Sequence, residues 1–311
     1  MAMLVAFLRE DTTPRRQPID VVGAVLLMTG IGGVIFGADR WGRIGTATAV
    51  TAFAAGMAAL VAFARHEVRT PAPMVTRTLW RSRVVVVGSL GAFAVGGAIM
   101  SVIASLPGYI QAVMGGTTGT AGLVLGIMVI VWTFGSISAG WLMVHITYRV
   151  TGYAGACGII AGALLLAMLT PHSSLGDAVL GVSILGIGLG FCNTTWIVCV
   201  QTGVAYHERG SATSAVMFMR FLGQALGAAV GGIILSFSMR HLLPGVSDPL
   251  GRLLDRQAAV TLAERADIAQ AASQAFHGVF LLTACMGLVA LTLTLRLPAG
   301  LSASTSRQTA T

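Results

Sequence analysis

The sequence contains no lysine, and its few charges leave long stretches of the chain entirely uncharged. Arginine supplies all 19 Lys+Arg positions, and Asp and Glu together number only 11 among 311 residues. Residues 84–148 contain no Asp, Glu, Lys or Arg. A soluble domain cannot lack charge over this length, because an element that faces water needs polar residues on its outer face. A bilayer permits it, since a helix crosses the hydrocarbon core, about 30 Å thick, with roughly 20 apolar residues.

Other absences exclude whole classes of function. The four cysteines lie in apolar runs without CxxC spacing, which excludes a disulfide framework and a zinc site. No nucleophile–base pair, metal-ligand spacing or phosphate-binding loop is present, so we predict neither an enzyme nor a bound cofactor. The pI near 10.3 comes from dispersed arginines with no compact basic face, so we predict no nucleic-acid partner.

What remains is apolar: 55% of the residues are hydrophobic, and the mean hydropathy is +0.84. Irregular backbone cannot face lipid, so the spans must be helices. The sequence therefore predicts an all-α polytopic membrane protein embedded in a lipid bilayer. Charge-free runs and the breakers between them give eight transmembrane helices, at about 20–38, 46–64, 84–113, 121–144, 153–170, 178–203, 213–238 and 274–296.

The arginines predict the orientation of these spans. Twelve lie in the amino-terminal segment, the even-numbered connections and the carboxyl tail, six lie in the odd-numbered connections, and Arg220 lies inside a span. The positive-inside rule places the richer set in the cytoplasm. We therefore predict a multi-pass protein of the cell membrane with both termini cytoplasmic. Residues 239–273 are then an extracytoplasmic loop, in which 250–270 is either an amphipathic helix on the membrane or a solvated connector.

Several motifs occur together in one order. Glu208-Arg209-Gly210-Ser211-Ala212 is followed by Arg220-Phe221-Leu222-Gly223-Gln224-Ala225-Leu226-Gly227, and Leu106-Pro107-Gly108-Tyr109-Ile110-Gln111 lies far upstream. The first two resemble the penultimate span of the fourteen-helix drug:proton antiporters of the major facilitator superfamily. The third resembles the family's Leu-Pro-x-Tyr-Leu-Gln. The resemblance covers residues from Ile19 to Leu297.

This resemblance implies a division of the chain, with the last six helices forming a major-facilitator half-bundle. The resemblance also implies a partner, an amino-terminal six-helix half, that is missing from this sequence. The implied parts are a helix stub and cytoplasmic linker at 1–18, a central transmembrane pair at 19–65, an Arg-rich cytoplasmic loop at 66–83, the carboxyl-terminal six-helix bundle at 84–297 and a cytoplasmic tail at 298–311.

The implied function is secondary active efflux of small amphipathic compounds or drugs, driven by a proton gradient across a bacterial plasma membrane. A proton-coupled exporter needs a membrane-embedded titratable group, usually Asp or Glu. All 11 acids of this chain lie in loops or near the ends of spans. The alternative is therefore a truncated or split membrane module without transport activity of its own.

Arg220 is the one charge placed within the hydrocarbon, where an unpartnered Arg costs about 3 kcal/mol on insertion scales. It either faces a substrate cavity or snorkels toward the cytoplasm. Its predicted helix face also carries Thr213, Met217, Gln224, Gly227 and Gly231. Polar and aromatic residues on other spans either line the same cavity or bond neighbouring helices. The full set of substrate-cavity candidates is Arg220, Gln224, Met217, Asn193, Trp196, Trp132 and Ser101.

The family resemblance also implies an inner gate built from cytoplasmic loops. Gly140 to Arg149 matches a Gly-x-Leu-x-Asp-Arg-x-Gly-Arg loop but lacks its acid, which weakens the expected latch. The inner-gate candidates are Gly140, Arg149, Glu208 and Arg209.

Overall fold

The computed structural model describes residues 20–40, 46–70, 81–243, 251, 253 and 262–297, and within these ranges the regular structure is helical. A π-helical turn, η1 (Tyr109–Val113), and a 3₁₀ turn, η2 (Tyr206–Glu208), accompany the long helices. The long helices are α2 (Val21–Arg40), α3 (Thr46–Arg69), α5 (Arg83–Gly108), α6 (Thr118–His145), α7 (Tyr148–Ala167), α8 (Leu175–Thr202), α9 (Arg209–Leu242) and α11 (Leu262–Leu295).

These helices confirm the predicted all-α membrane architecture. Within the described ranges, seven helices are long and apolar enough to cross a bilayer. The first predicted span, 20–38, corresponds to a shorter apolar helix, Val21–Gly37. At 1.5 Å per residue its 17 residues reach about 25 Å, slightly less than the hydrocarbon thickness.

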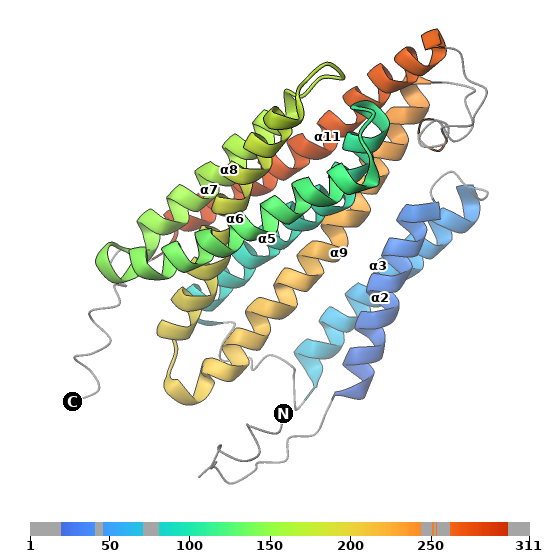
Figure 1. Ribbon diagram of the computed structural model, residues 1–311. Coiled ribbons are helices and arrows are strands. Elements are labelled where there is room, and N and C mark those ends of the chain that lie inside the picture. The colour runs from blue at the N-terminus through green and yellow to red at the C-terminus, as the bar shows by residue number, and fades with distance from the viewer. Residues whose placement is uncertain are drawn as a thin grey trace, which may run out of the picture.

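The long helices lie roughly along one common direction (Figure 1). The hairpin of α2 and α3 lies to one side, next to α9 (Figure 1). An aromatic contact joins this hairpin to the other helices, with the ring centroids of Phe63 on α3 and Phe218 on α9 5.6 Å apart. Val34 and Ala229 form a small apolar cluster between α2 and α9.

Close approach of α5 and α9 depends on glycine. A Cβ atom added to Gly227 would lie 2.5 Å from the carbonyl oxygen of Gly97, and one added to Gly223 would lie closer still to that of Phe93. A Cβ atom added to Gly96 would likewise collide with the backbone carbonyl of Arg220. In lipid there is no hydrophobic force between helices, so such backbone contact supplies the packing energy of the pair.

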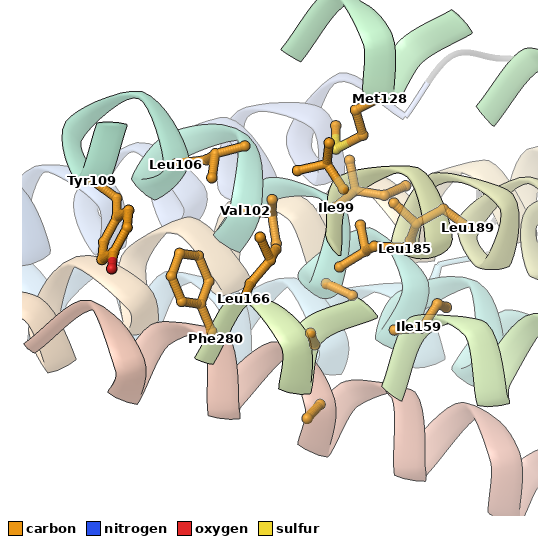
Figure 2. Packing of buried hydrophobic residues seen from close by; sticks show 14 of the residues in the cluster. Ile99, Val102, Leu106, Tyr109, Met128, Ile159, Leu166, Leu185, Leu189 and Phe280 are labelled. Carbon is orange, nitrogen blue, oxygen red and sulfur yellow. The ribbon is translucent and has the colours of Figure 1, made fainter. Parts of the chain in front are cut away.

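The main core lies between α5, α7, α8 and α11. Tyr109, at the start of the π-helical turn, is fully buried, and its ring makes edge-type contacts with Phe276 and Phe280. Figure 2 shows the ring of Phe280 beside Leu166 of α7. The π-helical turn begins two residues after Pro107, which lies in the last turn of α5.

Two helices differ from the expected limits. Helix α11 begins at Leu262, before the predicted span 274–296, so residues 262–270 of the predicted surface helix are the first turns of α11. At 34 residues, α11 and α9 each reach about 50 Å, well beyond the hydrocarbon. The predicted inner-gate loop is also shorter, because α6 runs through Gly140 to His145 and only two residues precede α7.

Candidate functional site

An open groove lies between α8 and α9 at the end where α9 begins. Gln201 of α8 donates a hydrogen bond to the hydroxyl of Thr213 on α9, at 3.0 Å. The cavity has a volume of about 510 Å³. Its lining mixes hydroxyl, amide, cationic and thioether groups, a combination suited to an amphipathic ligand. The lining residues are Gln201, Arg209, Gly210, Thr213, Ser214 and Met217.

Arg220 lies beyond Met217 on the same helix and bonds to α8. Its Nη1 donates to Oδ1 of Asn193 at 2.9 Å, and its guanidinium carbon lies 5.3 Å from the ring centre of Phe221. Its Nε is buried without a hydrogen-bond partner. The structure thus joins two of the predicted cavity residues, Arg220 and Asn193. Among the described residues, the contacts of the cation are a neutral amide and an aromatic ring.

The residues predicted to share one face of α9 have different surroundings at the two ends of the helix. Met217 lines the groove, and Gln224 is partly buried one turn beyond Arg220. Gly227, however, packs against the backbone of α5, and Gly231 lies 3.3 Å, measured from an added Cβ, from Val279 of α11. The stripe averages about 3.6 residues per step, so it stays on one face of the helix. Its inner part lies at the groove beside α8, whereas its outer part is covered by α5 and α11.

Three predicted cavity residues contribute to interhelical packing in this conformation. Trp196 is fully buried, and its ring lies against the position where Gly91 of α5 lacks a side chain. Ser101 is also fully buried, and its hydroxyl donates to the carbonyls of Gly97, at 2.8 Å, and Gly227, at 3.2 Å. Trp132 of α6 is partly buried against the main core. Packing was the alternative that the sequence left open for such residues.

The inner-gate candidates lie near two helix junctions, Gly140 and Arg149 beside the α6–α7 junction and Glu208 and Arg209 at the start of α9. Arg149 donates from Nη2 to the carbonyl oxygen of Leu295, so it caps the carboxyl end of α11, where a cation is favourable. Glu208 ends the 3₁₀ turn before α9, and the Arg209 guanidinium lies 5.4 Å from the ring centre of Tyr206. Gly140 has open space where a side chain would stand.

Two features escaped the sequence reasoning. Gln201 lies eight residues after Asn193, so helical spacing alone could have placed both on one face of α8. The second feature is a contact of Asp20 with His66 Nε2 at 3.0 Å, which ties α2 to the end of α3. The Gly23 backbone N–H and then the His66 side chain lower the pKa of the Asp20 carboxyl from its usual 3.8. Asp20 and His66 are 46 residues apart in the sequence, so only the tertiary fold brings them together.

Comparison with known proteins decides the family. A sequence model described as "Major Facilitator Superfamily" matches residues 19–228, more than half of the chain. The chain belongs to the Major Facilitator Superfamily. This confirms the family predicted from the motifs around Arg220 and Tyr109. Because members of this superfamily are transporters, it also confirms that the chain is not an enzyme.

Curated relatives of this superfamily member come mainly from bacteria. "Multidrug resistance protein 3" of Bacillus subtilis (strain 168) is 24% identical over 234 residues, covering 74% of this chain and 46% of the relative. "Multidrug resistance protein Stp" of Mycobacterium tuberculosis is 24% identical over 257 residues, covering 80% and 48%. "Cephamycin export protein CmcT" of Amycolatopsis lactamdurans is 30% identical over 230 residues, covering 70% and 47%. The chain thus spans about half the length of these relatives.

A solved structure supports the fold. The bacterial homologue of the human lysosomal transporter Spinster, in an inward-facing and unoccupied conformation, matches with a TM-score of 0.59 at 16% identity. The match covers 88% of this chain and 68% of that one. At this identity the likeness concerns the helical architecture alone.

Proposed function

We propose that this chain is part of a secondary active transporter that exports small amphipathic compounds in exchange for protons. The observation that carries this proposal is the polar groove between α8 and α9, within a bundle of the Major Facilitator Superfamily. The names of the relatives, two multidrug resistance proteins and a cephamycin exporter, support export as its direction. In a bacterium such a protein would work in the plasma membrane.

The groove can supply one wall of a substrate path. Met217 offers a polarizable apolar contact, while Gln201 and Thr213 offer amide and hydroxyl groups that fix orientation. Arg220 and Asn193 lie farther along the two helices and extend this polar strip. A substrate path also needs an opposite side, and we propose that an amino-terminal six-helix half supplies it.

Proton coupling needs a titratable group that the described helices do not place in mid-membrane. Their acids lie at or near helix ends, as with Asp20, Asp177 and Glu208. We therefore place the coupling carboxylate in the other half. A second possibility is a truncated or split module that is inactive alone, since the described helices carry no acid in mid-membrane.

Expression of the 311-residue chain alone is expected to give no proton-driven export, since its described helices carry no carboxylate in mid-membrane. The test is an efflux-deficient host preloaded with a fluorescent dye, whose loss is followed with and without an uncoupler. A host with the empty vector sets the background rate. Energy-dependent loss of dye above that rate, abolished by the uncoupler, would contradict this prediction.

The orientation can be tested at two described positions in a variant without the four native cysteines. We propose that both termini are cytoplasmic, so the loop before α8 lies outside and the turn before α9 lies inside. His172 and Tyr206 are exposed in these two connections. In intact cells an impermeant maleimide should label His172→Cys and spare Tyr206→Cys until the cells are opened. The reverse labelling would overturn the topology.

A further inference from the structure

Among the described residues, the charged side chain that lines the groove is a cation. Arg209 lines the cavity, and Arg220 lies 11 residues farther along α9, about 16 Å at 1.5 Å per residue. The lining contains no carboxylate. Glu208, the nearest acid to Arg220 along the chain, lies outside α9 beyond Arg209. A ligand that extends from this groove toward Asn193 therefore lies between two cations, Arg209 and Arg220.

Arg220 is held but not neutralised. Among the described residues it makes no ion pair, and its hydrogen bond goes to the neutral amide oxygen of Asn193. The hairpin brings Glu67 one turn beyond the contact of Phe63 with Phe218, yet no ion pair joins it to Arg220. The Nε hydrogen of Arg220 is buried and unpartnered. A partly buried cation with unused N–H donors favours an anionic ligand.

The donor set suits a carboxylate in particular. A guanidinium presents its N–H groups as a planar fork that matches the two oxygens of a carboxylate. The Asn193 amide accepts from Arg220 through oxygen, which leaves its NH₂ group as a further donor beside the fork. Met217, one turn toward the groove mouth, supplies an apolar surface next to these donors.

We propose that the α8–α9 groove selects amphipathic carboxylates, with the ligand's anionic group on Arg220 and Asn193 and its apolar part along Met217. This inference rests on the proposed export function and names its substrate class. Arg209 at the groove mouth attracts such anions and repels organic cations. A neutral compound of the same shape gains the apolar contact but forgoes the charge-assisted hydrogen bonds.

The test compares three probes with one aromatic core: 1-naphthylacetate, its methyl ester and 1-naphthylmethylammonium. The purified full chain in phosphatidylcholine nanodiscs is titrated by equilibrium dialysis, and binding to empty nanodiscs is subtracted. We expect the carboxylate to bind at least roughly tenfold more tightly than the ammonium probe, since hydrogen bonds to charged groups contribute that much or more. Equal affinities, or no saturable binding of any probe, would overturn the inference.

Three variants assign the preference to Arg220. Arg220→Gln should weaken carboxylate binding about tenfold or more, whereas Arg240→Gln, the same change at the exposed far end of α9, should leave it unchanged. Asn193→Asp covers the case in which Arg220→Gln fails to fold, because it gives Arg220 a built-in carboxylate that should exclude the ligand. A carboxylate preference that survives in Asn193→Asp would contradict the assignment.

Failure of this inference is distinguishable from failure of the proposed function. If the chain, completed with an amino-terminal half, exports the ester and the ammonium probe as well as the carboxylate, the export function stands and the anion selectivity is wrong. If the completed protein exports none of the three, the proposed function itself fails for these compounds.

Discussion

Replacing Gly223 with alanine is expected to destabilise the bundle, although alanine is the better helix former. The added methyl group would collide with the carbonyl of Phe93, which belongs to the backbone of α5 and cannot rotate away. Overpacking of this kind typically costs about 1–3 kcal/mol, and backbone displacement places the change toward the upper end. The measurement is the thermal midpoint of the purified chain in detergent, together with the yield of monodisperse protein.

The same helix supplies a matched control. Gly232 lies nine residues beyond Gly223 on α9 and has nothing within 4 Å of its added Cβ. Gly232→Ala should therefore keep or raise the thermal midpoint, since Gly costs a helix up to about 1 kcal/mol relative to Ala. A pair of leucine variants gives a larger contrast, with Gly227→Leu losing most folded protein and Gly232→Leu retaining it. Equal behaviour of the two sites would show that close α5–α9 contact is unimportant.

Arg220→Lys in a completed transporter is expected to impair export severely while leaving the amount of protein in the membrane unchanged. Lysine keeps the charge, but its ammonium cannot reproduce the planar fork that reaches Asn193 and the ligand together. Initial export rates normalised to membrane protein provide the readout. A residue that merely snorkels would tolerate lysine, which snorkels as well.

Gln224→Ala separates a role in substrate choice from a role in folding. Gln224 lies four residues beyond Arg220 on α9 and is partly buried. We expect its truncation to change the ratio of export rates between two substrates more than it changes protein level.

Normal export by Arg220→Lys at normal protein level would remove Arg220 from the substrate site and leave it as a residue that anchors α9 to α8.

The sequence alone determined the fold class and the family. Charge cannot be missing from residues 84–148 unless lipid surrounds them, and each breaker between apolar runs marks a turn because no irregular backbone can face lipid. Helical spacing predicted that Arg220 lies on the same face as Met217. These conclusions depend on local properties of the chain, so they needed no knowledge of which helices are neighbours.

Only the tertiary structure decided which predicted residues face the groove. Asn193 and Arg220 are 27 residues apart and meet because α8 and α9 are antiparallel neighbours, whereas Trp196, three residues beyond Asn193, faces α5. Ser101 donates a hydrogen bond to the carbonyl of Gly227, and Gly227 packs against the backbone of α5, so both residues serve contact between helices. In a membrane both sides of a helix are apolar, so hydrophobic periodicity cannot tell lipid from protein. Helix neighbours are therefore decided by backbone contact at glycines and by a few long-range polar pairs, which one-dimensional spacing does not contain.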